Sequence, residues 1–320
     1  MKIKKMHIIS LLYAALFVGT AYTAGQTFDL RLENLARFPF LGYTPEQTAD
    51  SLEPMRPTAW PRNFRGTQTN ALTYAEQLDS LFARAQAGDT VSIVHIGDSH
   101  VLGNYFPHAV EAVLQQAFPN LRFSYIGING ARAVRFTDDD MQARIAAHRP
   151  NLVIISFGTN EAHAGFDATA HRLVLSTLAD AIRQRTPQTA LLFTTPPGSY
   201  ISVAGRRWRD RRRRWHTSYV HRENPKTRLV ADNIRNYAHG QGLSLWDLFT
   251  LAGGQRFACE NWRNAGMMNT DRIHYTAEGY NLQGTLLGEA IVQAYRKYLA
   301  DQAARSGEHF QANQNEPTTE

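Results

Sequence analysis

A serine, a histidine and an aspartate occur in the 320-residue sequence at positions that could support acyl transfer. Ser99 lies within Gly97-Asp98-Ser99-His100, and Asp271 precedes His274 by three residues. Such chemistry needs a nucleophile, a base that takes its proton, a group that orients the base, and donors that stabilise an oxyanion. An aspartate at this spacing can reach one imidazole nitrogen while the other nitrogen faces the serine.

Two further segments could supply the oxyanion donors. They are Gly127-Ile128-Asn129-Gly130 and Gly158-Thr159-Asn160-Glu161. An asparagine amide can point an N–H at an oxyanion without carrying a charge that would attract the aspartate. Each segment also has a simpler explanation, because serines cap helices, glycines permit turns, and the aspartate could cap a turn while the histidine packs. Their joint occurrence in this order favours the chemical explanation.

The elements that must position these residues alternate between two kinds of apolar segment. Short β-branched runs predict five strands, at Val91–Ile96, Leu121–Ile126, Leu152–Phe157, Ala190–Thr195 and Leu243–Trp246. Longer periodic stretches predict helices at Thr73–Ala87, Tyr105–Ala117, Thr169–Arg185, Thr227–His239 and Thr276–Leu299. This order predicts a doubly wound α/β domain with a mostly parallel five-stranded sheet. Ligands of such sheets bind outside the carboxyl ends of the strands, where three of the four segments fall; the fourth, Asp271–His274, lies at a helix entry.

Over residues 90–300 the chain resembles the SGNH or GDSL-like esterases and acylhydrolases. The four segments correspond in order to the four sequence blocks of that family. The resemblance implies a flavodoxin-like α/β/α sandwich, with Ser99 as nucleophile, His274 as base and Asp271 as its orienting carboxylate. It also implies an oxyanion hole formed by the backbone N–H groups of Ser99 and Gly130 and the amide of Asn160. Which glycine of residues 127–130 donates stays open.

The substrate expectation depends on one departure from the commonest first block. His100 stands where the GDSL motif has leucine, as in branches that resemble carbohydrate and cell-wall O-acetylesterases. We therefore expect removal of O-acetyl groups from a carbohydrate such as peptidoglycan. His100 could act directly or support the site by hydrogen bonding, and Glu161 could contact a sugar hydroxyl or cap a loop.

Other activities fit the same four segments. A lipid-directed esterase, such as a lysophospholipase or thioesterase, would use the same site for longer acyl chains. An acyltransferase would use the same acyl-serine chemistry with a sugar acceptor, and a non-catalytic glycan-binding protein could keep the fold. The complete set of serine, histidine, aspartate and asparagine argues against the last of these.

Residues 1–25 read as a signal peptide, because three lysines precede a short apolar run that small residues follow. We expect export to a periplasm or to the exterior. Residues 26–71 contain several prolines and predict an irregular arm, residues 72–302 form the hydrolase domain, and residues 303–320 predict a disordered tail.

Composition argues against several classes of protein. Apolar residues make up 43% and charged residues 19% of the chain, which fits neither a disordered protein nor a coiled coil. The single cysteine, Cys259, cannot form an internal disulfide or a multi-cysteine metal site. The 12 histidines show no paired metal spacing, and Thr137-Asp138-Asp139-Asp140 reads as a helix start rather than a calcium loop. We expect no metal and no cofactor.

The longest insertion in the predicted domain is residues 196–226. It holds seven arginines within Arg206–Arg214, flanked by Trp208 and Trp215, and this run accounts for the excess of basic over acidic residues. We expect a mobile or surface loop, either a solvated helix face or a segment that binds an anionic polymer or a membrane surface. Nucleic acid is a poor fit for an exported esterase.

Overall fold

The computed structural model describes residue 52 and residues 56–314. Its centre is a parallel sheet of five strands in the order β2-β1-β3-β4-β7. The strands span Val91–Gly97 (β1), Leu121–Gly127 (β2), Leu152–Ser156 (β3), Ala190–Thr194 (β4) and Ser244–Trp246 (β7). The predicted doubly wound α/β class is confirmed, and all five predicted strands are present.

The two faces of the sheet carry separate hydrophobic cores. Ile154 belongs to one core and its neighbour Ile155 to the other, because successive side chains of a strand point to opposite faces. All five residues of β3 are buried, as expected for the middle strand of a parallel sheet that helices cover on both sides.

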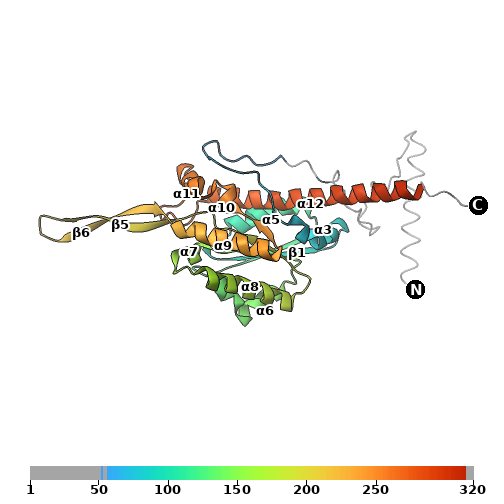
Figure 1. Cartoon of the computed structure of the whole chain (residues 1–320), viewed down its shortest axis with the longest axis horizontal. Helices are drawn as coiled ribbons and strands as arrows, with labels where there is room; N and C mark the ends of the chain where they lie inside the picture. The colour runs from blue at the N-terminus through green and yellow to red at the C-terminus, as the bar shows by residue number, and fades with distance from the viewer. Residues whose placement is uncertain (1–51, 53–55, 315–320) are drawn as a thin grey trace, which may run out of the picture. The chain divides into compact units, whose positions relative to one another are not determined.

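Helices α3, α5 and α12 cover one face, and α6, α8 and α9 cover the other (Figure 1). Their bounds are Asp79–Gln86 (α3), Tyr105–Ala117 (α5), Ala277–Gln314 (α12), Asp139–Ala147 (α6), Ala168–Arg185 (α8) and Pro225–Gln241 (α9). Residues 75–78 form a 3-10 turn before α3, and two helices that the periodicity does not predict, α10 (Leu248–Leu251) and α11 (Gly254–Asn264), follow β7. Predicted and observed ends agree within about two residues for three of the five predicted helices, and for the first one when the 3-10 turn is counted with α3.

The fifth predicted helix is longer than expected, and the expected tail is partly helical. Helix α12 continues through Gln314, so the prediction of a disordered tail from residue 303 is wrong for residues 303–314. Adding residues to an existing helix needs no new nucleus, so this segment can stay helical without an apolar face of its own. No helix in the described ranges combines the length and the apolar character needed to cross a membrane.

The predicted N-terminal segments lie largely outside the described residues. The signal peptide at 1–25 falls there entirely, as do residues 26–51 and 53–55 of the arm. Residues 56–71 have no helix or strand and lie against the domain. Thr58 donates to Glu289 of α12 through its backbone N–H and its hydroxyl, and Asn70 donates to the Leu286 carbonyl at 2.6 Å.

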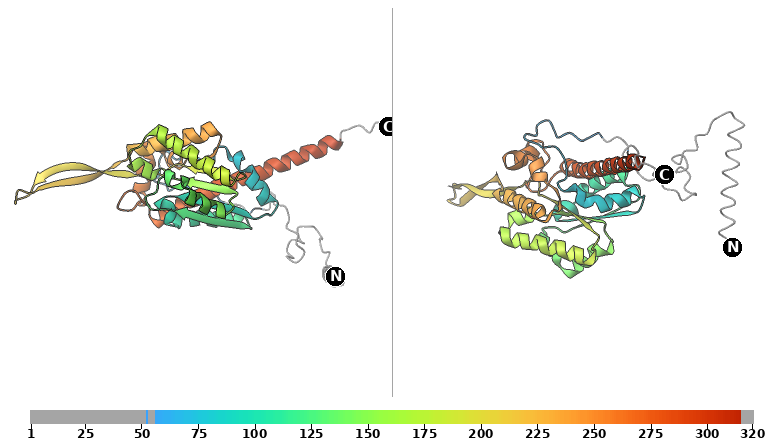
Figure 2. Two further views of the ribbon diagram at one scale, coloured as in Figure 1. Left: turned by 90° about the horizontal axis from the view of Figure 1, so that it is seen from below. Right: turned by 45° about the vertical axis from the view of Figure 1, so that its right-hand side comes forward.

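The arginine-rich insertion forms an antiparallel hairpin of β5 (Tyr200–Arg209) and β6 (Trp215–Glu223). The expectation of a loop or helix face is therefore wrong. The hairpin extends away from the sheet and its helices (Figure 2). Its register pairs Val203 with Val220 and Trp208 with His216. The sequence has no apolar stripe that could pack a helix here, and these cross-strand pairs stabilise the ribbon instead.

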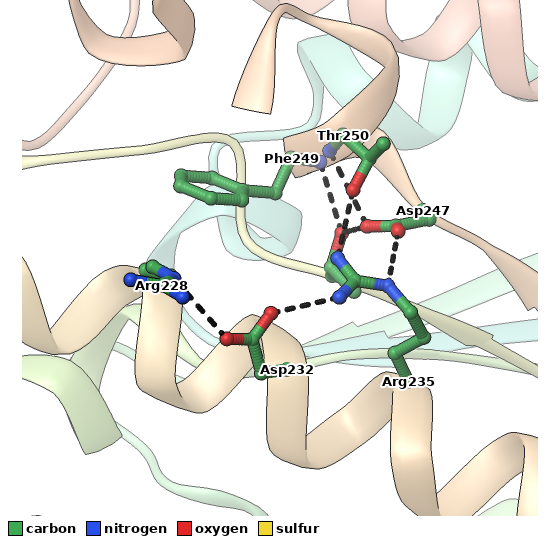
Figure 3. Close-up of polar contacts among 7 residues, drawn as sticks. Arg228, Asp232, Arg235, Asp247, Phe249 and Thr250 are labelled. Carbon is green, nitrogen blue, oxygen red and sulfur yellow. Dashed lines mark hydrogen bonds and ion pairs between the residues drawn. The ribbon is translucent and has the colours of Figure 1, made fainter. Parts of the chain in front are cut away.

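A partly buried polar network ties α9 to the segment after β7 (Figure 3). Arg235 donates to Asp247 at 2.6 Å, to Asp232 at 2.7 Å and to the Thr250 hydroxyl at 2.7 Å. Thr195, directly after β4, donates to Asp247 at 2.8 Å. These bonds fix the carboxyl end of β4, from which the chain enters the hairpin.

Candidate active site

The predicted site residues meet at the carboxyl edge of the sheet. Ser99 begins the short helix α4 (Ser99–Leu102) directly after β1, and Asn160 lies in α7 (Thr159–His163) after β3. Gly130 lies in the loop after β2, and the Asp271–His274 segment lies just before α12. β1 pairs with both β2 and β3, so these loops converge on one edge.

Ser99, His274 and Asp271 form a continuous hydrogen-bonded chain. His274 Nε2 lies 2.9 Å from Ser99 Oγ, and His274 Nδ1 lies 2.7 Å from Asp271 Oδ2. An ionised carboxylate can only accept, so Nδ1 carries the hydrogen of this pair and Nε2 is left to accept the serine proton. This is the arrangement of a nucleophile, a general base and an orienting acid.

Asp271 is held by its own turn. Its Oδ1 accepts from the backbone N–H groups of Ile273 at 2.9 Å and His274 at 3.0 Å. Burial raises the pKa of Asp271, but the hydrogen bonds from His274 and Ile273 outweigh it, so the pKa lies below its ordinary value. The carboxylate therefore stays ionised opposite the imidazole.

Asn160 is linked to the residue before the serine. Its Nδ2 donates to Asp98 Oδ2 and to the Ala131 carbonyl, at 3.0 Å each. Asp98 is also the N-cap of α4, since its Oδ1 accepts from the His100 backbone N–H at 2.9 Å. Burial raises the pKa of Asp98 to about 7, although these bonds and the charge of His274 act in the opposite direction.

Asp98 is the site residue whose part in the network was not predicted. An aspartate between a buried strand and the nucleophile has to be buried itself, and a buried carboxylate requires donors. That requirement is the signal by which the sequence could have shown its link to Asn160.

Gly130 lies at a tight turn in the loop after β2. The Ala131 N–H donates to the Ile128 carbonyl at 3.1 Å, which closes the turn with Gly130 at its third position. Gly130 has a φ of +68°, a value that favours glycine there. The turn is fastened to β1 because the Ile128 N–H donates to the Gly97 carbonyl at 3.1 Å.

Comparison with known proteins identifies the family. The profile of the GDSL-like Lipase/Acylhydrolase family matches residues 79–282, which is more than half of the chain. The chain belongs to this family. The family and the site geometry agree on a serine hydrolase that acts on ester bonds. Among curated proteins, none matches this sequence.

Solved structures with the GDSL-like fold resemble this chain at low identity. One titled as a peptidoglycan O-acetylesterase has a TM-score of 0.57 at 16% identity, and the match covers 70% of this chain and 96% of that one. A carbohydrate esterase family 3 protein from Talaromyces cellulolyticus has a TM-score of 0.45 at 15% identity, covering 65% and 99%. At 16% identity, the likeness to the first of these structures shows the shared fold.

His100, the departure from the GDSL motif, lies under the histidine of the site. Its ring is buried, with its centroid 5.4 Å from that of His274, and its Nδ1 lies 2.9 Å from the Tyr280 hydroxyl. Burial lowers the pKa of His100 to about 3, so the ring stays neutral. It contacts the base and not the serine hydroxyl, which fits a positioning residue.

Glu161 faces inward in this GDSL-like domain. Its Oε1 accepts from the Ala133 backbone N–H at 2.7 Å, at the start of the 3-10 helix η4 (Ala133–Thr137). Burial raises the pKa of Glu161 to about 7. Of the two hypotheses for this residue, the loop-capping one fits this contact, since the side chain holds the chain that leaves the Gly130 turn.

His163, at the end of α7, is a neighbour of the site that the sequence did not single out for catalysis. Its Nε2 lies 3.0 Å from the Ser199 hydroxyl at the base of the hairpin. Partial burial and the charge of His274 lower its pKa. Within residues 56–314, no three His, Cys, Asp or Glu side chains cluster as a metal site would require.

Proposed function

We propose that this GDSL-like esterase removes O-acetyl groups from a carbohydrate, with cell-wall peptidoglycan as the candidate polymer. The observation that carries the proposal is the hydrogen-bonded chain from Ser99 through His274 to Asp271. We further propose that the protein acts after export, directed by residues 1–25.

In the first half of the reaction, Ser99 Oγ attacks the carbonyl carbon of the ester as His274 Nε2 takes its proton. The negative charge that develops on the carbonyl oxygen is stabilised by the N–H groups of Ser99 and Gly130 and by the Asn160 amide. For the last of these, one amide hydrogen turns from the Ala131 carbonyl toward the oxyanion. His274 then gives its proton to the sugar oxygen, which leaves as a hydroxyl group.

In the second half, water attacks the acetyl group on Ser99. His274 takes a proton from the water, and the same donors stabilise the second oxyanion. Collapse of this intermediate breaks the bond to Ser99 Oγ, which receives the proton back as acetate leaves. Asp271 holds His274 in the required tautomer through both halves.

Two observations support an acetylated glycan as the substrate. The first is His100 in the motif position, which resembles O-acetylesterase branches of the family and lies buried against His274. The second is the match to the structure titled as a peptidoglycan O-acetylesterase, over 96% of that chain. The first observation places the motif residue His100 next to the catalytic base, and the second suggests peptidoglycan as the polymer.

The test is acetate release from O-acetylated peptidoglycan and from acetylated xylan, with Ser99→Ala as the blank. Release that depends on Ser99 from either polymer supports a carbohydrate acetylesterase and selects its substrate. A profile over p-nitrophenyl esters should fall steeply beyond acetyl or propionyl. A preference for octanoyl or longer esters would contradict the proposal and favour the lipid-directed esterase.

A further inference from the structure

The β5–β6 hairpin contributes no side chain to the hydrogen-bonded chain of Ser99, His274 and Asp271. Its strands pair with each other and with no other strand that the structure describes. It projects from the body of the domain (Figures 1 and 2). An isolated two-stranded ribbon is marginally stable in water, so an outside surface that covers it would stabilise it.

The base of the hairpin is attached to the catalytic segment. The Tyr200 N–H donates to the Arg272 carbonyl at 2.9 Å, between Asp271 and His274. The Tyr275 hydroxyl donates to the Gly198 carbonyl at 2.7 Å. With ten residues in β5 and about 3.3 Å per residue, the tip lies roughly 30 Å from this base.

The tip concentrates positive charge. All seven arginines of residues 206–214 are exposed. The one carboxylate in this segment, Asp210, has partners within the turn itself. It accepts a hydrogen bond from Arg214 Nε at 2.9 Å and lies 3.1 Å from His216 Nε2. Arg213 has a φ of +57°, the left-handed position that glycine usually fills in a hairpin loop of this kind. The turn thus carries an arginine at a position where glycine would relieve strain.

Aromatic rings lie on both faces of the ribbon at the tip. Trp208 pairs with His216 on one face, and Arg209 pairs with Trp215 on the other, because directly opposed residues share a face and successive ones alternate. Trp208 is 42% exposed and Trp215 52% exposed. Arg207 and Arg209 stack on the Trp215 ring at 4.2 and 4.4 Å, which leaves their planar N–H donors free for phosphate oxygens.

We propose that the tip of this hairpin, residues 206–216, docks on the surface of an anionic lipid bilayer. Arginines attract acidic headgroups, and tryptophans favour the interface between headgroups and acyl chains. An extended polymer would lie along one face of a ribbon, whereas here both faces and the turn between them carry cations and indoles. That distribution suits a tip that enters a headgroup layer and is surrounded by it, which would hold the active site near the membrane.

The test is sedimentation with vesicles of phosphatidylcholine alone and of equal parts phosphatidylcholine and phosphatidylglycerol. We expect binding to the anionic vesicles, weakened by salt, with a blue shift of indole emission. The variant with Arg206→Gln, Arg211→Gln and Arg212→Gln removes three exposed cations whose side chains form no hydrogen bond or ion pair with the described residues. Each cation near such a surface contributes about a factor of five, so this variant should bind about 100-fold more weakly.

The matched control is Arg122→Gln with Arg172→Gln and Arg183→Gln, three exposed arginines on the body of the domain. It makes the same change in net charge and should bind like the wild type. Equal binding by the hairpin variant, or no preference for anionic vesicles, would overturn the proposal. Binding to soluble polygalacturonate without an emission shift, and without vesicle binding, would also overturn it and would make the hairpin a site for anionic polymers.

Discussion

The side-chain amide of Asn160 donates to the buried carboxylate of Asp98, with 3.0 Å between Nδ2 and Oδ2. This bond joins the segments that follow β1 and β3. It ties the amide to Asp98, the residue that directly precedes Ser99 in the sequence. Asp98 caps the helix that Ser99 begins, so one carboxylate orients both the nucleophile's turn and the proposed oxyanion donor.

Replacing Asn160 tests its role as a donor. We expect Asn160→Ala to lower kcat roughly 10²–10³-fold, the usual cost of removing one oxyanion donor, with a smaller change in KM. Steady-state kinetics with p-nitrophenyl acetate measure both. Asn120→Ala removes an exposed amide bond to the Gly88 carbonyl and should leave kcat unchanged. An unchanged kcat in Asn160→Ala would take this residue out of the oxyanion hole.

Asp271→Asn tests the tautomer of the base. The asparagine amide can donate to His274 Nδ1, which would place the imidazole hydrogen on Nε2 and prevent it from accepting the serine proton. We expect kcat to fall about 10⁴-fold, as in other triads that lose their carboxylate. The matched control is Asp180→Asn, at an exposed aspartate on α8, and it should keep full activity. A loss of tenfold or less in Asp271→Asn would show that the carboxylate does not set the tautomer.

We expect Glu161 to make the free energy of unfolding depend on pH. Folded Glu161 keeps its proton up to a pKa of about 7, whereas its ordinary value is 4.5. The folded state therefore binds more protons between these values, and the free energy of unfolding falls as pH rises through them. Glu161→Gln keeps an oxygen for the Ala133 N–H but has no charge. It should be more stable than the wild type at high pH, by on the order of 3 kcal/mol.

Urea unfolding at about pH 5 and about pH 8 measures this difference. The advantage of Glu161→Gln should be largest at the higher pH and shrink toward the lower one. Equal differences at both pH values would mean that Glu161 does not titrate between them.

The core sheet could be predicted because most of its strands are short runs of buried apolar residues, as at Leu152–Ser156. The site could be predicted because parallel strands bring their carboxyl ends to one edge, so Ser99 and Asn160 had to lie close. Spacing alone could not show that the Asn160 amide points at Asp98 and Ala131. That direction depends on packing between loops far apart in the sequence.

The hairpin could not be predicted for a different reason. Residues 206–214 are almost all arginine, so neither helical nor strand periodicity of apolar residues is visible there. The strand is defined instead by its partner across the ribbon, as in the pair of Trp208 and His216. The helix over residues 303–314 likewise depends on a helix that has already formed before it.

The central claim is that Ser99 is a nucleophile activated by His274, and labelling by a fluorophosphonate probe tests it most directly. Such probes react with serines whose proton is taken by an adjacent base. The account predicts one label per chain, on the peptide that contains Ser99, with none on Ser99→Ala and full labelling of Ser202→Ala, which lacks an exposed hairpin serine. Labelling of Ser99→Ala equal to that of the wild type would contradict the account.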